Sequence, residues 1–249
     1  MFRRMTALMI LTLIGATVAQ AAAQAAPTTK TIRVLIVTGN DYPGHKWRLT
    51  TPAVRSALES RGRFDVRVCE DPEIMATRLA DRYDVVVLHF MNWETSSPSR
   101  AALDGLADFV RGGKGLVALH FACGAFGDWP EYVNLVGRVW DKSKTHDPLG
   151  PFRVQIAKKD HPITRGVEDF DITDELYFCL MGKPEIEVLV AARSKKTGQD
   201  EPMGFVLRYG QGRVFHTPLG HDVRAFSTPG LVRLIENGCE WAATGAVAP

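Results

Sequence analysis

The first half of this chain alternates short apolar runs with segments of helical spacing. The runs are rich in β-branched residues and end at loop residues, which is typical of buried strands; they span residues 32–37, 64–68, 83–88 and 115–119. One helix is expected to begin at Thr51-Pro52, because proline suits a first turn, and another to run from Ser97-Pro98 to Val110. Strands that alternate with helices in this way predict a doubly wound, mostly parallel α/β sheet.

The second half of the chain is less regular but continues the sheet. Further strands are expected over residues 152–156, 187–190, 204–208 and 214–216, and a closing helix over residues 229–241. No internal repeat or linker interrupts the pattern. A chain of 249 residues with 45% hydrophobic content can form one sizeable core, so we expect a single domain.

Residues 1–25 predict a secretory signal peptide. A short basic start is followed by an apolar stretch from Thr6 to Val18, which is short for a membrane span. Small residues then allow cleavage after Ala21 or Ala25. An uncleaved N-terminal anchor is the alternative. The mature protein is therefore expected to be periplasmic or secreted and, after cleavage, free of the membrane.

Removal of Arg3 and Arg4 with this segment changes the formal charge from +2 to 0. A neutral surface without a basic cluster argues against nucleic acid as a partner and leaves a small molecule as the expected one. Export would permit disulfides, but the pairing stays open for the four cysteines, which are Cys69, Cys123, Cys179 and Cys239. None of them forms a Cys-x-x-Cys pair, so a cysteine zinc site is not expected.

Histidines follow several of the expected strands. There are seven in the chain: His45, His89, His120, His146, His161, His216 and His221. The carboxyl ends of parallel strands meet along one edge of a sheet, where α/β proteins bind their ligands. Neutral imidazole is a common ligand of zinc-like metals, and carboxylates complete such sites. The sequence therefore predicts a histidine-rich pocket at that edge.

The histidines differ in what their surroundings indicate. His89 ends an apolar strand and is interpreted as a core residue, whereas His161, before a proline, is interpreted as part of a turn. His120 directly follows a strand on the expected ligand edge, which favours a functional role. Cys123, three residues later, is a competing nucleophile, although the segment Phe121-Ala122-Cys123-Gly124-Ala125 lacks the glycine pattern of a nucleophile elbow.

Taken in order, several segments resemble the ThuA-like (trehalose utilisation) family over nearly all of the mature chain. They are residues 34–39 through His45, 112–120, 129–132, His146, 161–163, 174–177 and 212–215 through His221. The resemblance implies a flavodoxin-like sheet of the class I glutamine amidotransferase type, in one α/β domain over residues 30–245. In amidotransferases a strand like 117–119 delivers the catalytic cysteine. Here His120 stands in that place, so the resemblance favours a metal or acid–base site over a cysteine triad.

The family is linked to the breakdown of trehalose and related disaccharides, including 3-keto sugars. The resemblance thus implies an exported carbohydrate-processing enzyme, a metal-dependent lyase or hydrolase that acts on a disaccharide or its 3-keto derivative. We assign a divalent metal, with zinc as the first choice, to His45, His120, His146 and His221. Glu175 is expected to be a general base or a ligand, Tyr177 to orient the substrate, and His120 to take part in catalysis.

Substrate-binding roles are assigned to Trp47, Trp129, Asp174 and His216. Tryptophan and tyrosine rings, including Trp93 and Trp140, offer faces for sugars, although ordinary core packing is the alternative for at least half of them. Two other functions stay open from the sequence alone. One is a non-catalytic periplasmic sugar-binding or accessory protein, and the other is a hydrolase that depends on Cys123.

Overall fold

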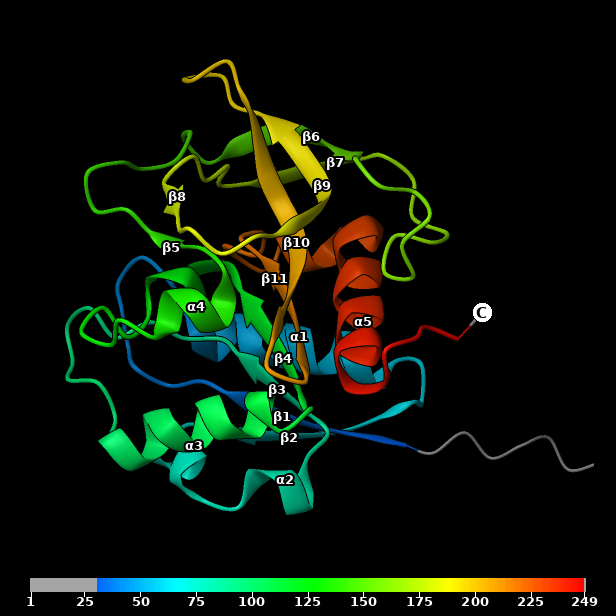
Figure 1. The fold of residues 1–249 in the computed structure, drawn as a ribbon. Coiled ribbons are helices and arrows are strands. Elements are labelled where there is room, and N and C mark those ends of the chain that lie inside the picture. Colours follow the sequence, from blue (N-terminus) through cyan, green and yellow to red (C-terminus); the bar gives the residue numbers. More distant parts are fainter. Residues whose placement is uncertain (1–30, 249) are drawn as a thin grey trace, which may run out of the picture.

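Five parallel strands form one half of a central sheet in a computed structural model that describes residues 31–248 (Figure 1). Their order across the sheet is β2 (Phe64–Cys69), β1 (Ile32–Val37), β3 (Val85–Leu88), β4 (Gly115–Leu119) and β11 (Gly212–Thr217). The chain moves outward from β1 to β2 and then returns past β1 to β3. This order is that of a flavodoxin-like fold, in which ligands bind beyond the carboxyl ends of the strands at the reversal point.

Antiparallel strands extend the same sheet beyond β11. They follow in the order β10 (Asp200–Tyr209), β9 (Glu187–Arg193), β6 (Gly150–Ile156) and β7 (Phe170–Asp174). A separate pair of short strands, β5 (Val139–Trp140) and β8 (Leu180–Met181), lies beside the sheet. The predicted α/β fold with a mostly parallel sheet is confirmed. Strands β5, β7 and β8 were not expected from the sequence.

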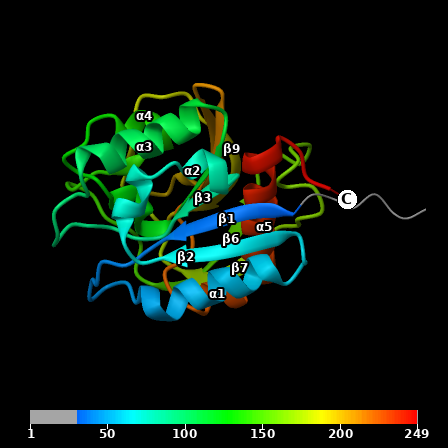
Figure 2. The same ribbon diagram turned by 90° about the horizontal axis from the view of Figure 1, so that it is seen from below.

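Helices cover both faces of the parallel half, which explains its continuous apolar strands. The helices α1 (Trp47–Glu59) and α5 (Pro229–Thr244) pack on one face, and α3 (Arg100–Arg111), α4 (Tyr132–Val136) and the short α2 (Leu79–Arg82) lie on the other (Figure 2). Alternate residues of β1 divide between the two cores: Val34 and Ile36 pack on the side of α1, whereas Leu35 and Val37 pack on the side of α3.

The helix boundaries differ from the predicted ones for identifiable reasons. Helix α1 begins at Trp47, more than one turn before Pro52, because the Trp47 ring is buried and its Nε1–H donates to Asp41 over 2.9 Å. Helix α3 begins after Ser99, whose side chain accepts a hydrogen bond from the amide of Ala102, and it ends at Gly112 as expected.

Three of the connections contain short helical turns, and the second of them begins at His120. They are η1 (Pro72–Ala76), η2 (His120–Gly124) and η3 (Ala225–Ser227). Among residues 31–248, no helix has both the length and the apolar character needed to cross a bilayer. The predicted signal peptide, residues 1–25, lies outside the described residues.

Candidate metal centre

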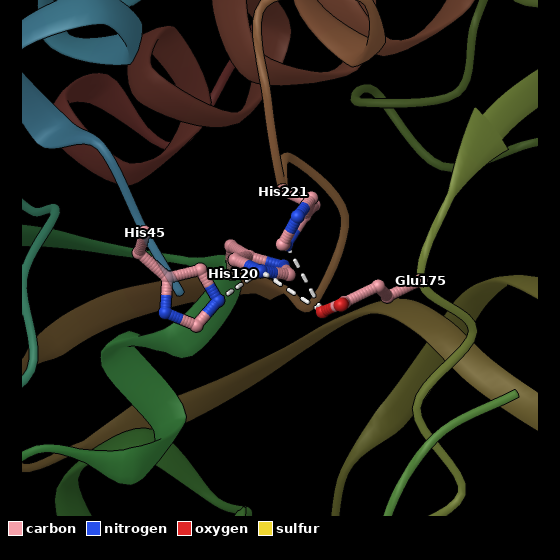
Figure 3. Close-up of side chains that lie close together, drawn as sticks. All are labelled: His45, His120, Glu175 and His221. Carbon is pink, nitrogen blue, oxygen red and sulfur yellow. Dashed lines mark hydrogen bonds and ion pairs between the residues drawn. The ribbon is translucent and has the colours of Figure 1, made fainter. Parts of the chain in front are cut away.

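Four side chains from separate parts of the chain converge beyond the carboxyl edge of the sheet (Figure 3). His45 lies in the loop after β1, His120 directly after β4, and His221 in the loop after β11. Glu175 directly follows β7. Each residue offers one ligand atom, and these four atoms all lie within 4.8 Å of one another.

His120 is the buried centre of this cluster. Its side chain is fully buried, and its Nδ1–H donates to the carbonyl oxygen of Pro218 over 2.7 Å. Because a carbonyl only accepts, the neutral ring carries its lone pair on Nε2, which faces the other members. The backbone of His120 has a φ of 49°, an unusual value for a residue other than glycine that is often retained at functional sites.

The Nε2 atom of His120 has three polar neighbours. It lies 3.0 Å from Nε2 of His45, 2.8 Å from the hydroxyl of Tyr177 and 3.7 Å from a carboxylate oxygen of Glu175. One lone pair cannot serve a histidine N–H, a tyrosine hydroxyl and a cation together. These groups therefore compete for a single acceptor.

Glu175 divides its two oxygens between two histidines. Oε2 lies 3.1 Å from Nδ1 of His221, on the side of the cluster, and Oε1 lies 3.6 Å from Nε2 of His146. Four ligands held tetrahedrally at about 2.0–2.2 Å from a zinc ion are roughly 3.3–3.6 Å apart. The separations of 3.0, 3.1 and 3.7 Å between cluster atoms bracket that value. All four atoms lie within 4.8 Å of one another, so shifts of the side chains by up to about 1 Å would bring the donor set to the spacing of one divalent ion.

Burial favours the neutral, ligand-competent form of two of the imidazoles. It lowers the pKa of His45 to about 3, with further lowering by the neighbouring histidines, and it lowers the pKa of His120 well below the usual value. For His221, burial also opposes the charged form, but the contact with Glu175 outweighs it and raises the pKa. A cation at the cluster would therefore compete with a proton for His221.

A cavity of about 220 Å³ opens onto the cluster. Its polar lining comes from His45, His146, Glu175, Tyr177 and His221. Its aromatic and apolar lining comes from Tyr42, Met91, Trp93, Phe121 and Trp140. Such a combination of ring faces and converging polar groups is typical of a small-molecule site.

Most of the predicted catalytic and metal residues are brought together. His45, His120, His221, Glu175 and Tyr177 all contact one another or the same cavity.

His146 lies next to the cluster but outside the set of four atoms. Its Nδ1–H donates to the carbonyl of Asp147 over 2.7 Å, and a backbone bridge joins His146 to Tyr177. Its role as a ligand stays a prediction.

The four residues assigned to substrate binding do not line this cavity. Trp47 and Trp129 are buried, and Trp129 packs against Tyr132. His216 is fully buried on the side of α4, where its Nδ1–H donates to Val136. Asp174 is fully buried behind Glu175. A substrate-binding role for these residues stays a prediction: Trp129 lines a hollow that adjoins this cavity, whereas His216 and Asp174 are fully buried.

The two histidines interpreted as structural lie in the core and in a turn, as expected. His89 is fully buried with Nε2 2.8 Å from the hydroxyl of Thr50, and His161 accepts a bond from the amide of Ile163 within a turn.

All four cysteines are free thiols. Burial raises the pKa of Cys123 well above its usual value, and Cys179 close by raises it further. A thiol in this state does not resemble an activated nucleophile.

Sequence reasoning missed two aromatic residues of the cavity, Tyr42 and Phe121. The ring of Phe121 stacks on His45, with centroids 3.8 Å apart and planes 11° apart. Tyr42 also stacks on His45, at 5.6 Å. Both lie within three residues of a predicted ligand, and that proximity is the signal that could have pointed to them.

Comparison with known proteins agrees with this geometry. The sequence profile of the ThuA family, described as trehalose utilisation, matches residues 33–242. A ThuA-like protein from Parabacteroides merdae has a similar structure, with a TM-score of 0.79, 27% sequence identity, and coverage of 88% of this chain and 92% of that one. For a ThuA-like protein from Bacteroides uniformis the TM-score is 0.70 and the identity 19%, with coverage of 91% and 98%.

The fold also occurs inside larger enzymes. A β-galactosidase from Bacillus circulans sp. alkalophilus matches with a TM-score of 0.59 and 16% identity, over 87% of this chain and 31% of that one, which shows a likeness of fold alone. No curated protein matches the sequence. With the profile match over 33–242 and the two similar structures, the chain belongs to the ThuA (trehalose utilisation) family.

Proposed function

We propose that this protein is an exported, metal-dependent enzyme that cleaves a disaccharide or its 3-keto derivative. The observation that carries the proposal is the convergence of three imidazoles and one carboxylate, His45, His120, His221 and Glu175, at the floor of an aromatic cavity. The family's link to trehalose utilisation supports a sugar as the substrate. Fold alone does not fix a reaction, so the proposal rests on the site.

Zinc is the ion that this donor set suits best. Three neutral imidazoles and one carboxylate are typical zinc ligands, whereas magnesium and calcium favour sites made of oxygen atoms. A divalent ion held there would polarise a carbonyl or hydroxyl oxygen of the sugar.

The cavity walls would hold the sugar ring. Tyr42, Trp93 and Trp140 present aromatic surfaces, which pack well against the C–H faces of a sugar. The Tyr177 hydroxyl lies at the floor of the cavity, 2.8 Å from His120, and would orient a sugar hydroxyl once released from that contact. Glu175 faces the same space. Its Oε2 atom would bind the metal, and its Oε1 atom, 3.6 Å from His146, would accept a proton from the substrate.

The presence of a single carboxylate in the cavity lining favours elimination over ordinary glycoside hydrolysis. Most glycoside hydrolases use two carboxyl groups that flank the bond. Among the residues the structure describes, Glu175 is the one carboxylate on the wall of this cavity. A 3-keto group makes the proton on C2 acidic. When Glu175 accepts that proton, the C2–H electron pair forms a C1=C2 double bond, the C1–O bond breaks, and the leaving oxygen takes up a proton.

Metal binding is tested first by elemental analysis of the purified full chain. We expect about one zinc or other divalent ion per protein, and loss of it in His120→Ala and in the isosteric Glu175→Gln. His161→Ala serves as a matched control, because His161 lies in a turn that packs against Trp241, away from the cluster. Circular dichroism shows whether each variant is folded. Absence of metal, together with full activity after chelation, would overturn the proposal.

Activity is tested with trehalose and with 3-ketotrehalose. Elimination predicts one glucose and one unsaturated keto sugar, which absorbs in the ultraviolet, for each molecule cleaved. Hydrolysis would instead yield glucose and 3-ketoglucose. Calorimetric binding without any product would identify a sugar-binding protein and contradict an enzymatic role.

A further inference from the structure

A second hollow, of about 430 Å³, adjoins the cavity of the candidate metal centre. The two share three residues, Trp93, Gly124 and Trp140, which form the boundary between them. The first cavity, at about 220 Å³, is smaller than the roughly 300–1,000 Å³ of ordinary small-molecule sites. Together the two hollows fall within that range. A substrate that fills both would place one part at the metal centre and another beyond Trp93.

The boundary between the two hollows is rigid. The Trp93 ring is 41% exposed, yet its Nε1–H donates to the carbonyl of Gly124 over 2.7 Å, and its edge meets Trp140 with centroids 5.5 Å apart. A Cβ on residue 124 would lie 3.1 Å from the Trp93 ring, so glycine allows the close approach. An exposed tryptophan held in one position is a preformed surface for stacking.

The lining of the second hollow is mainly apolar. It includes Val133, Val139 and Met181 besides the shared tryptophans, and Lys142 is the only charged side chain on it. Five large apolar side chains are exposed among residues 31–248, and two of them, Trp93 at 41% and Met181 at 50%, border this hollow. Exposed apolar groups gathered at one hollow indicate a binding surface rather than scattered surface residues.

The hollow offers few polar partners for the several hydroxyls of a second sugar, and Lys142 is the one charged side chain among them. The Trp129 Nε1 atom is buried without a partner among the described residues, and the Tyr132 hydroxyl already donates to the carbonyl of Ala122 over 2.6 Å. A sugar ring carries several hydroxyls that lose water on binding, and each needs a replacement partner. An aromatic hydrocarbon ring has no hydroxyls and therefore needs no such hydrogen-bond partners.

We infer that the second hollow binds the leaving group of the glycoside, and that this leaving group is aromatic. The inference rests on the proposed function, because it assumes that the sugar ring lies at the metal centre. It adds a second substrate class, aryl glycosides and their 3-keto derivatives, to the disaccharides of the proposed function. In the first cavity the polar residues recognise the sugar, and in the second Trp93 and Met181 recognise the aglycone.

The test is calorimetric binding of three probes to the full zinc-loaded chain: methyl glucoside, p-nitrophenyl glucoside and trehalose, with the first two in both anomeric forms. We expect p-nitrophenyl glucoside to bind at least about tenfold more tightly than methyl glucoside, from burial of the aromatic ring. Met181→Glu should remove most of this gain and leave methyl glucoside unchanged. Leu149→Glu is the matched control, because Leu149 is similarly exposed, at 41%, and lies outside both hollows.

The outcomes separate this inference from the proposed function. If methyl glucoside binds but the aryl group adds no affinity, the aromatic leaving group is wrong and the sugar site stands. If trehalose binds more tightly than p-nitrophenyl glucoside, the hollow holds a second sugar ring and the inference is also overturned. If none of the three probes binds, the inference is overturned, whereas the proposed function is decided by the assay with 3-ketotrehalose.

Discussion

The buried carboxylate of Asp174 accepts hydrogen bonds from the backbone amide of His221, over 3.0 Å, and from that of Gly220, over 2.7 Å. It also accepts one from the amide of its neighbour Glu175, over 2.8 Å. One side chain thereby fixes the backbone of two candidate metal ligands that lie 46 residues apart in sequence. Asp174 is best described as a positioning residue behind the cluster rather than as a contact for substrate.

Replacing Asp174 with asparagine should weaken metal binding. An amide has one acceptor oxygen, and its NH₂ group would face backbone donors that the carboxylate now satisfies. Loss of such supporting contacts typically lowers metal affinity by about 10–100-fold. Burial raises the pKa of Asp174 to about 6, so zinc affinity should be compared at pH 7.5 or above, where the carboxylate is ionised.

The matched control is Asp222→Asn. Asp222 is also next to His221 in sequence, but its carboxylate pairs with Arg224. The zinc affinity of Asp222→Asn should stay within about twofold of that of the parent protein, as measured by competition titration with a chromogenic chelator. Equal affinities for Asp174→Asn and Asp222→Asn would show that Asp174 does not position the ligands.

Removing the Tyr177 hydroxyl should strengthen metal binding while it impairs turnover. The hydroxyl lies 2.8 Å from His120 Nε2, and a metal ion needs the same lone pair. A neutral hydrogen bond contributes about 1 kcal/mol, so Tyr177→Phe should bind zinc about fivefold more tightly. The rate of sugar cleavage should fall, because the hydroxyl is no longer there to orient the substrate.

Zinc titration and steady-state kinetics on the same preparation check both parts of this prediction. If Tyr177→Phe binds zinc less tightly than the parent, the Tyr177 hydroxyl does not compete with the metal for His120 Nε2. An unchanged rate of sugar cleavage in Tyr177→Phe would show that the Tyr177 hydroxyl does not orient the substrate.

The parallel half of the fold could be predicted closely from the sequence. Strands β1 and β4 have the expected limits, Ile32–Val37 and Gly115–Leu119, because strands buried on both faces are continuously apolar and end at loop residues. The antiparallel half was harder to predict. Strand β7, Phe170–Asp174, lies at the edge of the sheet and has only two apolar residues, Phe170 and Ile172, so its pattern is too short to distinguish from a loop.

The grouping of the histidines depended on topology that the sequence does not state. His216 and His221 are five residues apart, but His216 lies within β11 with its ring in the core, and His221 lies beyond the strand end in the cluster. His45 and His120 meet because β1, β3 and β4 are neighbours in the sheet. Residue type and position after a strand identified the candidates, whereas the order of the strands decided which of them converge.

The protein should lose stability as the pH falls below about 6.5, partly through His216. Burial lowers the pKa of His216 to about 4. Between pH 6.5 and 4 the unfolded chain binds a proton at this residue and the folded chain does not, so acid favours unfolding. One such group contributes a slope of about 1.4 kcal/mol per pH unit.

Urea unfolding of the metal-free protein at several pH values measures this slope. In His216→Leu it should be smaller by roughly the contribution of one group. Part of the dependence of stability on pH should remain in His216→Leu, because burial also lowers the pKa of His89 to about 4. The same slope in both proteins would mean that His216 titrates alike when folded and unfolded.

The reactivity of the cysteines distinguishes a metal-dependent enzyme from a cysteine hydrolase. Cys69 is partly exposed, whereas Cys123, Cys179 and Cys239 are buried, and burial raises the pKa of Cys179 to about 12. A thiol reagent at pH 7.5 should therefore label one cysteine quickly in the folded chain and all four after denaturation. Sugar cleavage should survive the fast reaction, since Cys69 is not among the residues that line the cavity. A catalytic thiolate at Cys123 would react first and abolish activity, so mass spectrometry of the labelled residue distinguishes the two mechanisms.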